Sequence, residues 1–186
     1  PDQFIDRTRH RADTFFGEGL VAHVSLADPV CPVLAHIAAA GARGAGGRVH
    51  EGGTYVCMEG PQFSTRAESR VYRSIGATVI GMTNMQEARL CREAEMCYAT
   101  LALVTDYDCW KTDEPPVTVD TVVARLRTNA ERASRAIVHV AGQLPPERAC
   151  ACATSLDIAI ITAREAIPRT TREKLGPIVA RALGDA

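Results

Sequence analysis

Short β-rich segments alternate with helical segments through the middle of this sequence, and few architectures accommodate that order. Runs of β-branched and apolar residues predict strands, whereas apolar residues repeated every three or four positions predict helices. In chain order the predicted elements are a strand at Thr54–Met58, a helix at Thr65–Ile75, a strand at Thr78–Met82, a helix at Gln86–Glu95 and a strand at Cys97–Thr105. Strands separated by single helices are typical of a parallel sheet covered on both faces.

Further helices are predicted outside this region from apolar residues at helical spacing: Val33–Ala40, a long helix from about Thr118, and shorter helices near Thr154–Thr162 and Thr171–Leu183. A glycine-rich stretch at Gly41–Gly47 is expected to end the first of them. The sequence therefore predicts one α/β domain over residues 1–186. Its twisted sheet would be largely parallel or mixed and flanked by helices, with a helical C-terminal portion.

Composition and charge disfavour several classes of protein. Hydrophobic residues make up 46% of the 186 residues, which is enough to bury a core. Lys and Arg number 21 against 22 Asp and Glu, so no basic surface for nucleic acid is indicated. Apolar runs such as Cys97–Val104 are too short to cross a bilayer, and Pro1–Arg11 is polar, without the apolar core of a secretory signal. We therefore expect neither a nucleic-acid partner nor a membrane partner.

The seven cysteines are an odd number in a chain without a recognisable signal, which indicates reduced thiols and a cytoplasmic location. Only Cys150 and Cys152 are closely spaced, and neither a CxxC pair nor histidines at ligand spacing accompany them. This pattern argues against zinc, and we expect no metal ion. Cys150 and Cys152 would be either a redox or local disulfide pair or, more simply, small buried thiols.

Ligands of parallel sheets bind beyond the carboxyl ends of the strands, so the candidate site residues are those that follow the predicted strands: Glu59–Ser64, Met82–Asn84 and Asp106–Trp110. Strand periodicity would place Asp106 and Asp108 on one side. Two neighbouring carboxylates resist ionising together, so one would keep a proton and donate it to a heterocyclic nitrogen. The alternative is a solvated acidic turn that caps a helix.

Thr83 and Phe63 each allow two interpretations. Thr83, at a predicted helix N-terminus, would bind an anion or simply cap its own helix. Phe63, in the turn after Gly60-Pro61, would stack on a base or pack over the sheet edge. The sequence contains no GxSxG or HExxH motif, nor a GxGxxG motif after a strand. Catalysis would therefore depend on carboxylates, hydroxyls and backbone groups.

At these same segments the chain resembles the trimeric purine nucleoside phosphorylase family, and within it the members that act on 5′-methylthioadenosine. The resemblance is carried by Met58–Ser69, Gly81–Glu87, Ala102–Trp110 and Asp2–Thr8. It runs from Asp2 to about Ile137, and the stretch from Pro145 resembles the longer tail of bacterial members. It implies phosphate-dependent cleavage of the N-glycosidic bond, giving adenine and 5-methylthioribose 1-phosphate. The transition state would be oxocarbenium-like on the ribose, with negative charge developing on the purine.

The resemblance implies roles for residues of the purine site. Asp106 would bridge N7 and the N6 amino group of adenine and donate the proton to N7. Asp108 would support the same edge of the purine, with Tyr107 between the two carboxylates in the binding segment. Phe63 would pack on the base.

The same resemblance places the ribose on Met82 and the phosphate on Thr83, with inorganic phosphate as co-substrate and no cofactor. The family's remaining phosphate-binding motifs precede the segment that matches Asp2–Thr8. The chain is thus expected to be the C-terminal part of a nucleoside phosphorylase domain, with weak or no activity by itself.

Specificity is also implied by the resemblance. Members that act on 6-oxopurines carry Glu in place of Ser64 and Asn in place of Asp106, so both residues here favour a 6-aminopurine. Val119 and Val122 match apolar positions that favour a methylthio group over a 5′-hydroxyl. His23 resembles a residue that a neighbouring subunit lends to the pocket, which implies a homotrimer.

Two other functions stay open at the level of sequence. The first is a related enzyme that prefers adenosine or methylthioinosine. The second is a non-catalytic purine-binding fragment that keeps the base pocket and the subunit surface without phosphate chemistry.

Overall fold

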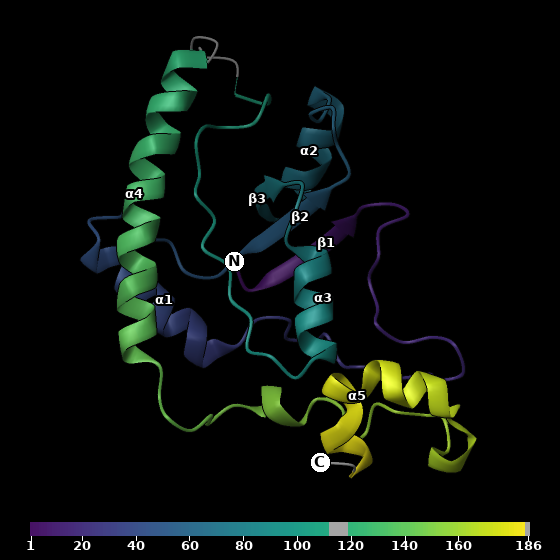
Figure 1. Cartoon of the computed structure of the whole chain (residues 1–186). Coiled ribbons are helices and arrows are strands. Elements are labelled where there is room, and N and C mark those ends of the chain that lie inside the picture. Colours follow the sequence, from purple (N-terminus) through teal and green to yellow (C-terminus); the bar gives the residue numbers. More distant parts are fainter. Residues whose placement is uncertain (112–118, 185–186) are drawn as a thin grey trace.

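The computed structural model describes residues 1–111 and 119–184, and these form a parallel sheet flanked by helices (Figure 1). The predicted α/β class is therefore confirmed. The elements are β1 (Gln3–Arg7), α1 (Pro32–Gly44), β2 (Thr54–Met58), α2 (Arg66–Ser74), β3 (Ala77–Gly81), α3 (Met85–Glu93), α4 (Val119–Gln143) and α5 (Arg169–Leu183), with short 3₁₀ helices at Ala151–Thr154 and Arg164–Ala166.

The sheet has the order β1-β2-β3, and both pairings are parallel. Ile5 pairs with Val56, and Val56 pairs with Ile80, so the three carboxyl ends lie at one edge. β2 is the central strand, and its residues Val56 and Cys57 are completely buried. β2 has the predicted bounds, whereas β1 was not predicted as a strand.

Helices α2 and α3 connect the strands or follow them, and each begins at a local capping contact. The Thr65 hydroxyl accepts from the Glu68 N–H at 3.2 Å, and the Glu68 carboxylate accepts from the Thr65 N–H at 2.7 Å. This reciprocal pair fixes the start of α2. The predicted apolar repeat on α2 is real but uncovered, because Val71 is 56% exposed and Ile75 is 55% exposed.

Helix α1 extends beyond the predicted Val33–Ala40 and passes through the first glycines of Gly41–Gly47. Gly41 does not break the helix; it lies where α1 packs against α4. A Cβ atom at Gly41 would stand 3.0 Å from the Ala136 carbonyl oxygen and 3.1 Å from the His139 ring. The glycine therefore allows two helices to approach closely, and α1 continues to Gly44.

The predicted strand at Cys97–Thr105 is wrong. This segment passes beside α4, and side chains of that helix bind its carbonyl groups. Asn129 Nδ2 donates to the Val104 carbonyl at 3.2 Å, and the Arg125 guanidinium donates to the Thr105 carbonyl. Apolar content predicted a strand, but no neighbouring strand among the described residues supplies a ladder for it.

The predicted helix near Thr154–Thr162 is also wrong, whereas the one at Thr171–Leu183 is confirmed as α5. Beyond the 3₁₀ helix that ends at Thr154, the backbone pairs with residues 21–23. The His23 N–H donates to the Ala159 carbonyl at 2.8 Å, and the Ile161 N–H donates to the Val21 carbonyl at 2.9 Å. Those bonds replace the helical ones.

Two apolar clusters stabilise the fold. One lies by the sheet, where Tyr55, Cys57 and Met85 are buried against Phe4 and Val79. The other joins the two ends of the described chain: Leu20, Ile167, Leu175, Val179 and Leu183, with Phe16 packed against them. Helix α5 is thus held by a segment that lies far from it in sequence.

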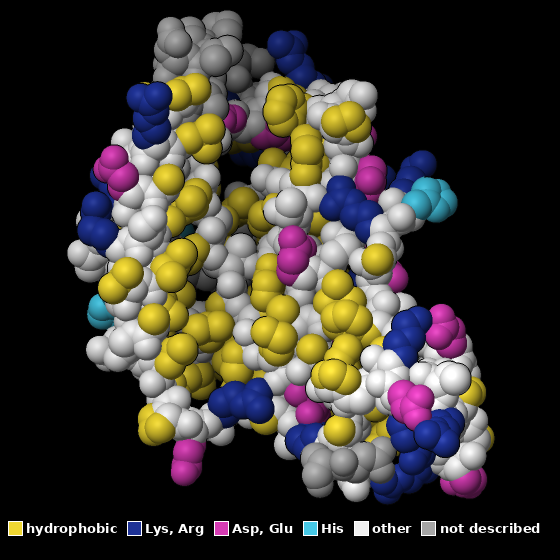
Figure 2. Space-filling view, viewed as in Figure 1, with side chains coloured by type: hydrophobic (Ala, Val, Ile, Leu, Met, Phe, Trp, Pro, Cys, Tyr) yellow, Lys and Arg dark blue, Asp and Glu magenta, His cyan; other side chains and the backbone are white. Residues whose placement is uncertain are grey.

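Apolar side chains also remain exposed over part of the surface, as the space-filling view shows along α4 and across the centre of that face (Figure 2). The exposed large residues include Leu103, Val104, Leu126, Ile137 and Val138. Among the described helices, none has both the length and the hydropathy required to cross a bilayer.

Candidate active site

The candidate site lies at the carboxyl edge of the sheet, where β2 continues into Glu59–Ser64 and β3 continues into Met82–Asn84. Because the strands are parallel and adjacent, these two segments meet. The segment Thr105–Trp110 reaches the same place from beside α4. Cys109 Sγ lies 3.4 Å from the Ser64 carbonyl oxygen, which joins the third segment to the first.

Arg11 holds the first two segments together, and sequence reasoning missed it. Its guanidinium donates to the Glu59 carbonyl at 2.6 Å and to the Met82 carbonyl at 2.5 Å. Its Nε also lies 3.2 Å from the Glu59 carboxylate. A planar guanidinium has enough fixed donors to satisfy several carbonyls at once. No short motif surrounds Arg11, so only the fold could reveal this role.

Glu59 is held in its ionised form by the same arrangement. The Arg9 N–H donates to its carboxylate at 2.6 Å. This bond, together with the charge of Arg11, holds the pKa of Glu59 below its usual value. Glu59 is therefore an anionic anchor for the loop between β1 and α1.

The turn after β2 is shaped by Gly60, whose φ of 71° favours glycine. The Gly60-Pro61 peptide bond is cis. A Cβ atom at Gly60 would lie 2.7 Å from Met82 Sδ, so the Gly60 backbone packs directly on the Met82 side chain. Two of the predicted segments are thus in close contact at these residues.

Thr83 is exposed and stands directly before the N-cap residue of α3, Asn84. The Asn84 N–H donates to the Glu87 carboxylate at 2.8 Å, and Asn84 is 4% exposed with a φ of 101°. A non-glycine residue rarely adopts this conformation, and its surroundings must hold it there. The Thr83 hydroxyl therefore lies at a helix start whose geometry is firmly fixed.

The acidic segment that contains Asp106 and Asp108 makes local hydrogen bonds. The Thr105 hydroxyl donates to the Asp106 carboxylate at 2.6 Å, and the Cys109 N–H donates to the Asp108 carboxylate at 2.8 Å. Tyr107 packs edge-on against Trp110, with 5.8 Å between the ring centroids. The acidic groups are therefore flanked by aromatic rings.

Cations lie over both aromatic rings of this segment. The Arg73 guanidinium stands 3.5 Å from the Trp110 ring centroid, and the Lys111 ammonium stands 4.1 Å from that of Tyr107. Such contacts stabilise an exposed loop by about 0.5–1 kcal/mol each. The Arg73 contact also ties this segment to α2, which follows Glu59–Ser64.

Phe63 is 84% exposed, so it does not pack over the sheet edge. Ser64, its neighbour, points its hydroxyl toward Met58 Sδ at 3.6 Å. The ring of Phe63 is therefore available to a ligand, and its stacking on a base stays a prediction.

Three predicted residues are not brought to this site by the described side chains. His23 lines a groove of about 470 Å³ between the segment 13–26 and α3, together with residues such as Phe16 and Glu93. Val119 and Val122 begin α4, but their side chains fall outside what the structure describes.

Comparisons with known proteins give consistent results. The sequence profile described as the phosphorylase superfamily matches residues 1–141. The S-methyl-5′-thioadenosine phosphorylase of Koribacter versatilis is 54% identical over 185 residues, which cover 100% of this chain and 63% of that protein. The protein of the same name from Gloeobacter violaceus is 54% identical over 189 residues. This match covers 97% of this chain and 62% of that protein.

Solved structures agree in fold. A methylthioadenosine phosphorylase from an antarctic soil metagenomic library has a TM-score of 0.90 and 47% identity, over 96% of this chain and 63% of that one. The methylthioadenosine phosphorylase from Schistosoma mansoni in complex with adenine has a TM-score of 0.71 and 31% identity, over 79% of this chain and 59% of that one. The chain thus spans less than two thirds of the length of these relatives.

Proposed function

The chain belongs to the phosphorylase superfamily, and from this membership we propose that the protein cleaves 5′-methylthioadenosine with inorganic phosphate, giving adenine and 5-methylthioribose 1-phosphate. The observation that carries the proposal is the convergence of Glu59–Ser64, Met82–Asn84 and Thr105–Trp110, through Cys109 on Ser64 and Gly60 on Met82. Relatives 54% identical to this chain bear the name S-methyl-5′-thioadenosine phosphorylase.

In the proposed reaction Asp106 binds N7 and the N6 amino group of adenine. As the glycosidic bond breaks, negative charge develops on the purine, and a proton from Asp106 neutralises it at N7. A positioned general acid contributes about 10²–10⁴-fold to such a step. Asp108 and Tyr107 hold the same edge of the purine, and the exposed ring of Phe63 covers its face.

The ribose lies on Met82, and phosphate binds at Thr83. The dipole at the start of α3 favours an anion at this position. Phosphate held there attacks the anomeric carbon, and positioning of the two reactants supplies much of the acceleration. Inorganic phosphate is the co-substrate, and the reaction needs no other cofactor.

Specificity for adenine follows from Asp106 and Ser64. A carboxylate accepts from a 6-amino group, which a 6-oxopurine lacks. Val119 and Val122 supply the apolar wall for the methylthio group.

The protein acts as a cytoplasmic homotrimer in this proposal, with His23 completing the nucleoside pocket of a neighbouring subunit. Support comes from the apolar side chains exposed on this chain, such as Val104 and Val138, which are 64% and 74% exposed. Contiguous exposed apolar surface marks interfaces. Light scattering of the full-length gene product should give three times the subunit mass.

The test is adenine release from 5′-methylthioadenosine by the full-length gene product, with and without phosphate, in wild type, Asp106→Asn and Asp108→Asn. Asp106→Asn should lower kcat/KM at least a hundredfold, because the general acid is lost. Asp108→Asn should lower it less, about tenfold, through lost hydrogen bonding.

Adenosine and methylthioinosine serve as comparison substrates, since one solved relative is described as an adenosine/methylthioadenosine phosphorylase. The amide that Asp106→Asn introduces can donate to a 6-oxo group, so this substitution should shift preference toward methylthioinosine. A rate of adenine release that is the same with and without phosphate would overturn the proposal of phosphorolysis. Purine binding without cleavage would favour the non-catalytic alternative.

A further inference from the structure

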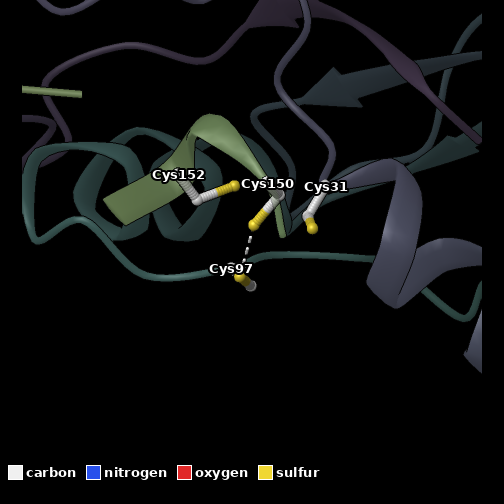
Figure 3. A group of neighbouring side chains, drawn as sticks. All are labelled: Cys31, Cys97, Cys150 and Cys152. Carbon is white, nitrogen blue, oxygen red and sulfur yellow. Dashed lines mark hydrogen bonds between the residues drawn. The ribbon is translucent and has the colours of Figure 1, made fainter. Parts of the chain in front are cut away.

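Four cysteines from three separate parts of the chain converge away from the candidate active site (Figure 3). Cys31 precedes α1, Cys97 follows α3, and Cys150 and Cys152 lie at the 3₁₀ helix of the C-terminal region. Their four Sγ atoms all lie within 4.8 Å of one another, and those of Cys97 and Cys150 are 3.4 Å apart. All seven cysteines of the chain are free thiols in this structure.

This arrangement matches what a tetrahedral metal ion requires. With Zn–S bonds of about 2.3 Å, the sulfur atoms of a four-thiolate site stand about 3.8 Å apart. The sulfur atoms would have to move by about 1 Å or less to reach that spacing. A disulfide, in contrast, requires only two sulfurs at about 2.05 Å and gives no reason for four to converge.

We propose that Cys31, Cys97, Cys150 and Cys152 bind one zinc ion in a closed structural site. Binding displaces the four thiol protons and involves no change of oxidation state. With four protein ligands no position is left for water or substrate, so the site is structural and not catalytic.

The surroundings of the four sulfurs suit a buried thiolate site. Cys31 is 1% exposed and Cys152 is 4% exposed, so bulk water has little access. Cys31 is also the N-cap residue of α1, where the helix dipole stabilises a negative sulfur. Its N–H donates to the Tyr98 carbonyl at 2.8 Å. Because Tyr98 directly follows Cys97, this bond holds Cys31 close to Cys97.

The ion would fasten the C-terminal region to the α/β part of the fold. Cys150 and Cys152 follow an exposed connection after α4, whereas Cys31 and Cys97 belong to the part built around the sheet. Cys31, Cys97 and Cys150 are too far apart in sequence to form a metal-binding spacing motif such as CxxC. A site that the fold assembles in this way leaves no spacing motif in the sequence, so the expectation of no metal ion is corrected here.

The first test measures zinc in the full-length, untagged gene product, expressed with zinc and purified under a phosphine reductant. Elemental analysis by inductively coupled plasma mass spectrometry should give about one zinc ion per chain, as for a four-cysteine structural site. Cys150→Ser and Cys152→Ser should each lower zinc affinity about a hundredfold or more, measured by competition with a chromophoric chelator. Cys91→Ser, a partly buried cysteine outside the cluster, should keep full occupancy.

Cobalt replacement of zinc in the wild-type protein tests the ligand set without any variant, so misfolding cannot obscure the result. Four thiolates should give intense tetrahedral d–d bands and thiolate-to-cobalt charge transfer. Cys152→His should keep the metal with these bands shifted. Reduced wild-type protein without bound zinc or these bands would overturn the proposal. A disulfide within the cluster, detected by intact mass in metal-free protein that rejects zinc after reduction, would also overturn it.

Discussion

The Thr100 hydroxyl donates to the side-chain oxygen of Asn84 at 2.6 Å, and the Tyr98 hydroxyl donates to the same oxygen. Burial raises the pKa of Tyr98, so its hydroxyl stays protonated and keeps this donor. The two bonds hold Asn84 at its unusual φ of 101°. The segment that follows α3 thereby fixes the residue next to Thr83, and with it the start of α3.

Replacing Thr100 by Val tests this support. The variant loses one hydrogen bond to a buried group, so the free energy of unfolding should fall by about 1 kcal/mol. Because Asn84 would then be held less firmly, the KM for phosphate should rise severalfold. Thr78→Val makes the same replacement of a hydroxyl by a methyl group, at the exposed start of β3, and should leave the KM for phosphate unchanged. Equal phosphate kinetics in the two variants would contradict the link from Thr100 to Thr83.

Replacing Arg11 by Lys tests the joint between the strand ends. An ammonium group cannot reach the Glu59 and Met82 carbonyls in the same fixed geometry, so the two segments should loosen. We expect kcat/KM for 5′-methylthioadenosine to fall about tenfold, the loss of roughly one hydrogen bond to a charged group. Arg7→Lys, at the exposed end of β1, serves as the control. A fully active Arg11→Lys enzyme would show that Arg11 does not position the site.

Gly60 and Gly76 provide a matched pair for alanine substitution. Both have positive φ, 71° and 83°, so each alanine should cost about 1 kcal/mol in backbone strain. A Cβ atom at Gly76 meets nothing within 4 Å, whereas one at Gly60 meets Met82 Sδ at 2.7 Å. Gly76→Ala should therefore lower only the melting temperature. Gly60→Ala should also raise the KM for the nucleoside, and identical kinetics would exclude a role for Met82 at the ribose.

The environment of Asp6 predicts how the free energy of unfolding depends on pH in acid. Burial acts to raise its pKa, but hydrogen bonds from the Thr8 hydroxyl and N–H, together with Arg89, outweigh burial and leave the pKa below its usual 3.8. A lowered pKa in the folded state adds stability that is fully present above about pH 4. That stability is lost as the pH falls through the lowered pKa.

Asp6→Asn should therefore cost about 1 kcal/mol at pH 7, and the difference from wild type should vanish in strong acid. Asp13→Asn removes a second carboxylate partner of Arg89, one that is 52% exposed. It should change stability by less than about 0.5 kcal/mol at any pH. Urea unfolding at pH 7, 5 and 3 measures both. A constant difference across this range would contradict the assignment.

The sequence predicted those elements whose signals are local. β2, α2 and α3 follow from short-range periodicity and from caps such as Thr65 with Glu68. It failed where tertiary partners decide: Cys97–Thr105 has the apolar content of a strand, but α4 side chains bind its carbonyls.

The candidate site divides in the same way. Its loops were predictable because parallel strands must end at one edge, so Ser64, Met82 and Thr83 were indicated in advance. Arg11 was not, since a lone arginine has no sequence signature until folding brings the Met58, Glu59 and Met82 carbonyl groups around it. The convergence of Cys31 and Cys97 on the Cys150–Cys152 pair was missed for the same reason, since the four positions are spread between 31 and 152.

The contact between the segment around Leu20 and α5 limits the order in which these two parts can fold. The Thr171 hydroxyl donates to the Glu18 carbonyl across 153 residues of sequence. Leu20 also packs with Val179 in one apolar cluster. During synthesis Leu20 emerges long before α5 and cannot be covered until that helix has been made. Closing so long a loop is entropically costly and slow. The sheet can form first, and the contact between the segment around Leu20 and α5 forms after it.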